Sequence, residues 1–180
     1  MASRNVVIIA TAALAALFVG YAGANAESIT MPDTLNVPAN QELSLEVQAT
    51  GVQIYECKAG EDEPTRFEWA LKAPEADLYD STNRKIGKHY AGPTWESADG
   101  SKVVGELKAK DNGPDSDAIP WLLLTAKSTS GNGIFAKTMS IQRVNTSGGK
   151  APAGGCSQSQ AGKEMRVEYK ATYRFYTAKP

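Results

Sequence analysis

The segment Arg166-Val167-Glu168-Tyr169-Lys170-Ala171-Thr172-Tyr173-Arg174-Phe175 decides the fold class. Apolar or aromatic residues alternate one by one with charged or polar residues along it, which is the period of a β-strand with one buried face. The same alternation occurs in 43–48, 67–71 and 102–110. Turn signals separate about eight to ten such short segments, and no helical period of useful length follows residue 40. We therefore predict a single all-β domain, an antiparallel sandwich or flattened barrel with little helix.

Three details of the strand pattern are specific enough to check. Thr50-Gly51 is predicted to break the first strand, and residues 73–80 are predicted to form a loop that enters a short strand near Leu78. Residues 119–126 are apolar on both faces, which predicts a central strand that is covered on both sides. Another strand is predicted to run from Ile134 to Val144.

The N-terminus has the pattern of a secretory signal peptide. Arg4 precedes an uncharged apolar run at 6–19, and Ala24-Asn25-Ala26 matches a signal-peptidase site. The alternative is an uncleaved membrane anchor, but the run is shorter than the roughly 20 residues that span a bilayer. We predict a cleaved signal peptide at 1–26, an extended lead-in at 27–40 and one β domain at 41–180. The protein is then exported, periplasmic or extracellular, with no transmembrane segment after cleavage.

The charge balance excludes one class of partner. Removal of 1–26 removes a single charged residue, Arg4, so 18 Lys and Arg remain against 20 Asp and Glu. A chain without a basic block lacks the means to neutralise a phosphate backbone, so nucleic acid is not expected as a partner.

The chain contains two cysteines, Cys57 and Cys156. In an exported protein an even pair predicts a disulfide, and two separate buried thiols are the alternative. The bond would close a loop of about 100 residues and, from chain entropy, stabilise the fold by about 4–5 kcal/mol.

One short stretch gathers the residue types that bind ligands. It contains His89, the single histidine, together with Tyr90, Trp95, Glu96 and Asp99. Aromatic faces stack on apolar ligand faces and carboxylates accept hydrogen bonds from hydroxyls, so these residues are candidates for binding a small polar ligand such as a sugar. The alternative is that the rings pack in the core and that His89 is a structural hydrogen-bonding group at a strand end.

The same region does not contain a complete set of catalytic residues. His89 could form a triad with Asp77 or Asp99 and with Ser97 or Ser101, but no glycine pattern of a nucleophile elbow surrounds either serine. The pairs Glu75 with Asp77 and Glu96 with Asp99 could act as acid and base on a glycoside only if the fold sets their separation. We assign no catalytic residue.

Metal and cofactor sites are not expected either. A zinc site of several histidines is impossible with one histidine. The loop Asp111–Asp117 offers oxygen ligands for calcium, but its spacing differs from that of an EF-hand, and a solvated turn is the preferred interpretation.

Several motifs in a fixed order resemble a known family. They are Gly51-Val52-Gln53-Ile54-Tyr55-Glu56-Cys57, Trp69 with Ala73-Pro74-Glu75-Ala76, His89-Tyr90-Ala91-Gly92-Pro93-Thr94-Trp95-Glu96, Asp99-Gly100-Ser101, Pro120-Trp121-Leu122-Leu123-Leu124, Gln142-Arg143-Val144 with Thr146 and Gly148-Gly149, Cys156 and Tyr169-x-Ala171-x-Tyr173. Together they resemble the exported bacterial and fungal proteins grouped as domain of unknown function 3455. The resemblance runs from about Leu35 to Tyr176 and implies export and a β fold, but it implies no activity, cofactor or catalytic residue.

The sequence thus favours an exported, non-enzymatic binding or surface module. Its partner would be a small polar ligand or a component of the cell envelope. A hydrolase acting on a carbohydrate or ester is the first alternative, and a structural envelope or stress protein is the second. The pattern does not specify an oligomeric state.

Overall fold

The computed structural model describes residues 30–180. The predicted signal peptide and the first residues of the lead-in lie outside this range. Within it, no helix has the length and apolar character to cross a membrane. The elements are η1 Asp33–Leu35, β1 Gln41–Ala59, β2 Phe67–Tyr79, β3 Lys85–Tyr90, β4 Thr94–Ser97, β5 Lys102–Asp111, β6 Trp121–Ser130, β7 Ser140–Gly148, η2 Gln158–Gln160 and β8 Glu164–Ala178.

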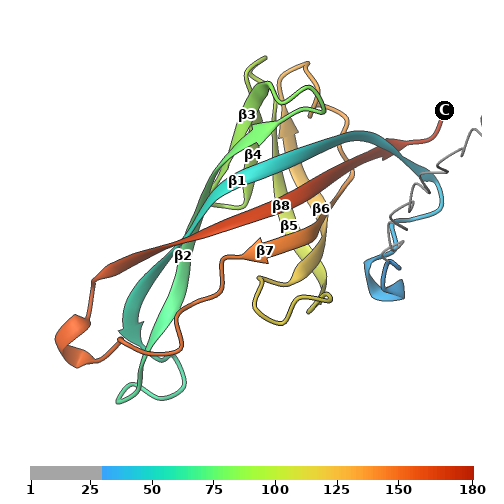
Figure 1. Cartoon of the computed structure of the whole chain (residues 1–180). Coiled ribbons are helices and arrows are strands. Elements are labelled where there is room, and N and C mark those ends of the chain that lie inside the picture. The colour runs from blue at the N-terminus through green and yellow to red at the C-terminus, as the bar shows by residue number, and fades with distance from the viewer. Residues whose placement is uncertain (1–29) are drawn as a thin grey trace, which may run out of the picture. The chain divides into compact units, whose positions relative to one another are not determined.

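The strands form one closed antiparallel sheet in chain order (Figure 1). Each strand pairs with the next, and β1 also pairs with β8 along most of its length, which closes the barrel. The two helical elements are single 3₁₀ turns of three residues each. The prediction of an all-β fold with little helix is confirmed, and the sheet takes the barrel form.

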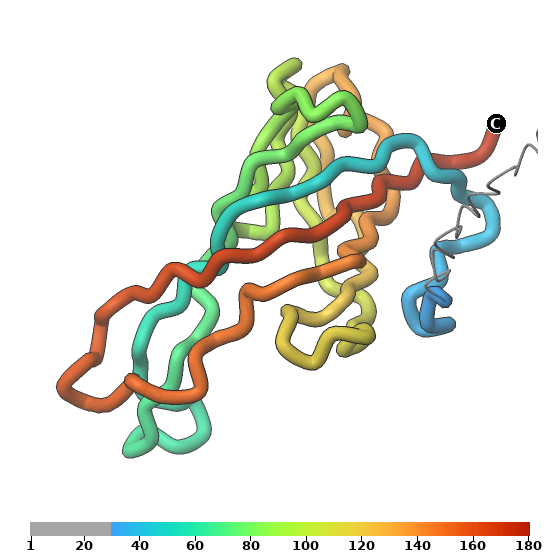
Figure 2. The backbone as a smooth tube through the Cα atoms, in the orientation of Figure 1, coloured from blue at the N-terminus to red at the C-terminus, as the bar shows by residue number. Residues whose placement is uncertain are grey.

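The expected break at Thr50-Gly51 is wrong, because β1 runs unbroken through it (Figure 2). Gly51 lies where β1 and β2 approach each other so closely that a Cβ atom would collide with the backbone of Glu75 and Ala76. The glycine therefore permits a close approach of the paired strands β1 and β2 and does not end β1.

Two other boundaries also differ from the prediction. Residues 73–79 belong to β2, and Pro74 is tolerated there because β3 pairs with β2 only from Ala76 onward, so the strand has a free side at the proline. The strand expected from Ile134 begins instead at Ser140. Residues 134–139 form a loop that inserts Phe135, which is fully buried, into the barrel.

The barrel interior has a closed end and an open end. We call the end with loops 80–84, 98–101 and 131–139 the closed end, and the end with the turn 91–93 and loops 112–120 and 149–163 the open end (Figure 1). Apolar side chains fill the closed end. The principal ones are Val47, Leu78, Val103, Phe135, Ile141 and Phe175.

The first half of strand β6 is covered on both faces, as its composition predicts, whereas residues 127–130 are exposed. Leu122 and Leu124 face the interior, whereas Trp121 and Leu123 form a second cluster outside the barrel with Leu35 of η1. Gln142 fixes the lead-in there, because its Nε2 donates to Leu35 O at 2.7 Å. Residues 31–40 therefore act as a cover for β6 and β7.

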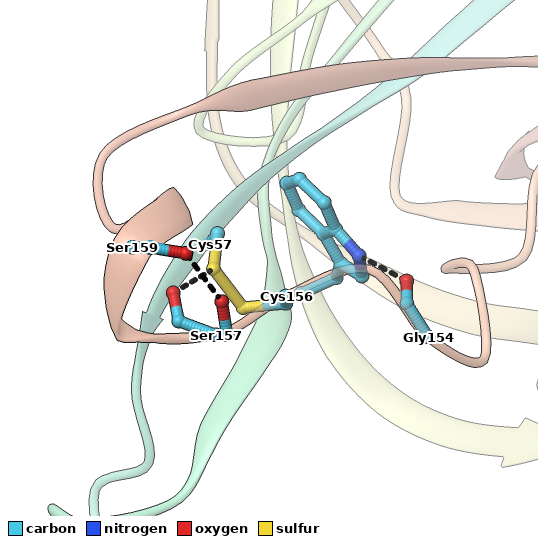
Figure 3. Close-up of a disulfide and its surroundings, with 6 residues drawn as sticks. Cys57, Gly154, Cys156, Ser157 and Ser159 are labelled. Carbon is cyan, nitrogen blue, oxygen red and sulfur yellow. Dashed lines mark hydrogen bonds between the residues drawn. A yellow bond between two sulfur atoms is a disulfide. The ribbon is translucent and has the colours of Figure 1, made fainter.

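The predicted disulfide between Cys57 and Cys156 is present and spans a sequence separation of 99 residues (Figure 3). It connects the end of β1 to the loop 149–163. Two side chains hold the same loop: Trp69 Nε1 donates to Gly154 O at 2.8 Å, and Tyr55 Oη donates to Gly149 O at 2.6 Å. The loop is thus fastened along the open end of the barrel.

Candidate functional site

A cavity of about 330 Å³ lies inside the barrel toward the open end. Every strand contributes to its wall, so the cavity is the part of the barrel interior that side chains leave unfilled. One lining residue from each strand in chain order is Gln53, Leu71, His89, Trp95, Leu107, Leu124, Arg143 and Tyr173. Small eight-stranded barrels either fill their interior with side chains or leave space for one small ligand. In this barrel, side chains fill the interior at the closed end only.

The cavity opens between β2 and β5, below the turn 91–93. Strand β3 pairs with β2 only as far as Ala76, and β4 pairs with β5 only as far as Val104. Beyond those residues β2 and β5 continue without a strand between them. Leu71 and Leu107 line this gap and are 58% and 56% exposed. We call the gap the portal.

Three polar atoms in the cavity wall are buried without a partner. Gln53 Nε2, Trp95 Nε1 and Tyr173 Oη have no hydrogen-bond partner among residues 30–180, and each of these residues is 1% exposed. The Tyr169 and Arg143 side chains lie near Tyr173 Oη without reaching hydrogen-bond geometry. A buried polar group without a partner costs about 1–3 kcal/mol, so three in one wall call for an explanation.

His89 is a neutral member of this wall. It is 3% exposed and stacks on Trp95 with ring centroids 4.4 Å apart. Its Nδ1 lies 2.9 Å from Thr94 O, and because a carbonyl only accepts, Nδ1 carries the proton and Nε2 is left as an acceptor. Burial lowers the pKa of His89 to about 3, so the ring is uncharged at neutral pH.

Tyr90 and Glu96 point to the outer surface, because their neighbours His89 and Trp95 point inward. Tyr90 Oη donates to Glu96 Oε2 at 2.7 Å, and Lys102 lies 3.4 Å from the same oxygen. The hydrogen bond from Tyr90, with smaller effects of Lys102 and Lys88, lowers the pKa of Glu96. The predicted cluster is therefore divided by the wall of the barrel.

Asp99 belongs to the closed end. Its Oδ1 accepts from Ser101 Oγ at 2.6 Å, and its Oδ2 accepts from Ile134 N at 2.9 Å. These bonds, that of Ser101 Oγ first, lower the pKa of Asp99 to about 2. Asp99 thereby joins the β4–β5 turn to the loop that inserts Phe135, and it lies away from the cavity.

The family comparison covers the whole barrel. The model of the family described as "Protein of unknown function (DUF3455)" matches residues 38–177. The chain belongs to the DUF3455 family. Neither the curated proteins nor the solved structures contain a match. The matched DUF3455 region includes every residue of the cavity wall, and the family description names no activity.

The hydrolase alternatives are not assembled in this DUF3455 chain. His89 is bonded to a backbone carbonyl, while Ser101 is bonded to Asp99 and Ser97 Oγ donates to Ile86 O. The carboxylates of Glu75 and Asp77 are paired with Arg166 and Lys85. No serine therefore lies beside His89, and Ser101, which does contact the Asp99 carboxylate, is fully buried at the closed end.

The acidic loop after β5 is held by its own turns. Asp111 Oδ1 accepts from Gly113 N, and Asp115 Oδ1 accepts from Asp117 N. In the described part of the chain, no three His, Cys, Asp or Glu side chains converge as metal ligands.

Sequence reasoning singled out His89 and Trp95 of the cavity wall but missed Gln53, Arg143 and Tyr173. A signal for two of them exists. Gln53 is in phase with the inward residues Ala49 and Tyr55 of β1, and Arg143 is in phase with Ile141 of β7. A polar side chain at an inward position of a strand is uncommon, so such positions mark a candidate site.

Proposed function

We propose that this protein is an exported, non-enzymatic binding module that holds one small ligand in the barrel cavity beside His89 and Trp95. One observation carries the proposal: the barrel interior holds a cavity with an open portal, and three residues of its wall keep polar atoms that have no partner within the described chain. Ligand sites typically combine mostly apolar walls with a few polar groups that orient the ligand, and this wall has that composition.

The energetics support a ligand in this place. Gln53 Nε2 and Trp95 Nε1 are donors with almost no accessible surface, and they would gain hydrogen bonds from an acceptor on a bound molecule once their side chains shift slightly toward it. The indole of Trp95 stacks on His89 on one side and meets Tyr173 edge-on at 5.2 Å, which fixes its orientation. Trp95 is therefore oriented before a ligand arrives, so only small side-chain shifts would accompany binding and little side-chain entropy would be lost.

Export is supported by the sequence of 1–26 and by the disulfide. Disulfides persist in oxidising compartments, and Cys57–Cys156 is the only cysteine pair in the chain. A binding module placed outside the cytoplasm would meet its ligand in the envelope or the medium.

The test is a thermal-shift screen of the purified, disulfide-bonded protein against small acidic, basic and neutral molecules with apolar parts. A ligand at 100 times its Kd stabilises by about 2.7 kcal/mol, which corresponds to a rise in Tm of roughly 5–10 °C for a domain of this size. The blocking variant is Leu71→Trp, because Leu71 lines the portal and pairs with the inward residue Tyr55, so a larger side chain there would cover the opening.

The matched control is Leu43→Trp, which enlarges a leucine of similar exposure on β1 outside the wall. A ligand that shifts the wild type and Leu43→Trp, but not Leu71→Trp, supports the proposal. The proposal fails if no molecule shifts the wild type, or if the shift persists unchanged in Leu71→Trp.

A further inference from the structure

Arg143 is the one charged side chain of the cavity wall that is not at its rim. The other two, Lys72 and Glu106, are exposed residues of β2 and β5 beside the portal. Lys72 is already paired with Glu56 and Glu164. Arg143 is half-buried and lies opposite Leu122 on one side and Tyr173 on the other, so its side chain enters the barrel from β7.

The charge of Arg143 is not compensated by the protein. None of the ion pairs among residues 30–180 includes it. Its Nε and Nη2 donate to Pro120 O at 3.0 and 2.8 Å, which fixes the guanidinium but leaves Nη1 for another acceptor. A carbonyl oxygen carries no formal charge, so the positive charge remains available to the cavity.

The polar groups around Arg143 can also contribute to binding an anion. Gln53 Nε2 and Trp95 Nε1 can only donate, and the Tyr173 hydroxyl can donate. Burial is the main cause that raises the pKa of Tyr173, and the positive charge of Arg143 acts in the opposite direction. Apart from the acceptor His89 Nε2 and the carboxylate of Glu106 at the rim, the polar groups of this wall can donate and surround one cation, and such a set is complementary to an anion.

Apart from His89 and the rim residues Lys72 and Glu106, the rest of the wall is mostly apolar. Leu122 lies opposite Arg143 on β6 with Leu124 two residues further along the strand, and Leu71, Pro93 and Leu107 line the portal. An anion that enters here must carry an apolar body, and a single cation matches a single negative charge. We infer that the ligand of the proposed binding function is a small monocarboxylic acid, with its carboxylate at Arg143, Gln53 and Tyr173 and its apolar part toward the leucines of the portal.

The test compares acids with alcohols of the same carbon skeleton. The probes are octanoate with octanol, and 3-phenylpropanoate with 3-phenylpropanol, measured by calorimetric titration at pH 7.5. Hydrogen bonds to charged groups contribute about 1.5–3 kcal/mol, so wild type should bind each acid about 10- to 100-fold more tightly than its alcohol. Arg143→Met should abolish this preference.

Arg174→Met is the matched control. Arg174 lies on β8 and pairs with Glu46 at 2.7 Å, outside the cavity wall. Its loss should leave the preference unchanged. If Arg143→Met fails to fold because the bonds to Pro120 are lost, Arg143→Lys should retain the preference for the acid. Gln53→Leu, which removes a donor but not the charge, should reduce that preference.

The failures of the two proposals can be told apart. Equal binding of acid and alcohol by the wild type, or an undiminished preference in Arg143→Met, overturns the carboxylate inference and leaves the binding module intact. Absence of binding by all four probes also overturns the inference. The binding module itself is judged by the broader screen with Leu71→Trp, in which neutral and basic ligands count equally.

Discussion

At the closed end of the barrel, Phe135 and Phe175 pack with ring centroids 4.6 Å apart, whereas at the open end Gln53, Arg143 and Tyr173 face a cavity of about 330 Å³. The two ends use the same strands. Along β7 the inward residue Ile141 belongs to the apolar cluster and the next inward residue, Arg143, belongs to the cavity wall.

This difference shows how the molecule divides two tasks along each strand. Close packing at one end supplies the stability, because buried apolar side chains in dense contact dominate the folding free energy. Unfilled space at the other end, with the unpartnered atoms of Gln53, Trp95 and Tyr173 beside it, lowers stability in the place where we propose the binding site. Natural proteins commonly keep such costs at functional sites.

The difference in packing between the two ends is tested most directly by truncating one side chain at each end. Phe175→Ala should lower the free energy of unfolding by about 3–5 kcal/mol, because Phe175 is fully buried and a cavity would form in dense packing. Leu122→Ala should cost about 1–2 kcal/mol, because Leu122 is half-buried and already borders open space. Urea unfolding measures both, and equal losses would show that the two ends are packed alike.

The dependence of stability on pH tests how dry the wall of the open end is. The pKa of His89 falls from 6.5 to about 3 on folding, so the unfolded chain binds the proton more readily. This contribution to stability is complete above pH 6.5 and is lost as the pH falls toward 3. Between pH 7.5 and 5 the free energy of unfolding should drop by about 2 kcal/mol.

His89 is the single histidine, so His89→Gln should lose this slope between pH 7.5 and 5, where carboxylates titrate little. Urea unfolding at several pH values supplies the measurement. If the free energy of unfolding of the wild type does not change over that range, water in the cavity must hydrate the imidazolium of His89.

The smallest expected change in the free energy of unfolding comes from Gln53, which we compare with Gln142. The two glutamines are buried alike, at 1% and 2% exposed. Gln53 Nε2 has no partner, so Gln53→Leu should raise the free energy of unfolding by about 1 kcal/mol. Gln142 bonds to Leu35 O and accepts from Tyr176 Oη at 2.6 Å, so Gln142→Leu should lower it by about 1–3 kcal/mol. Shifts of the same sign in both variants, seen by thermal unfolding, would contradict a functional role for the unpartnered amide.

The alternation of residues was sufficient to predict the β fold, because side chains on opposite faces of a strand must differ when one face is buried. The absence of alternation in 119–126 correctly indicated a doubly covered strand, although the strand begins at Trp121 and both faces are covered chiefly at 121–124. The boundaries at Gly51 and Pro74 could not be predicted in this way. Both residues usually end a strand, and here each is accommodated by a tertiary feature, a close crossing at Gly51 and an unpaired strand side at Pro74.

The candidate site was predictable only in part. His89 and Trp95 are close in sequence and face inward together, but their neighbours Tyr90 and Glu96 lie outside the wall. Arg143 comes from a strand about 50 residues later in the chain. Alternation shows which side of the sheet a residue faces, but it does not show which inward positions meet and which leave space between them.

The portal has a further consequence for self-association. A closed barrel has no sheet edges, and the gap below the turn 91–93 is where the described strands β2 and β5 each leave one side unpaired. Such sides can recruit a strand from a second molecule. Here the β2 side carries Lys72 and Pro74 and the β5 side carries Glu106 and Lys108, and charged residues and prolines disfavour strand addition. The opening can thus admit a small molecule while resisting edge-to-edge aggregation.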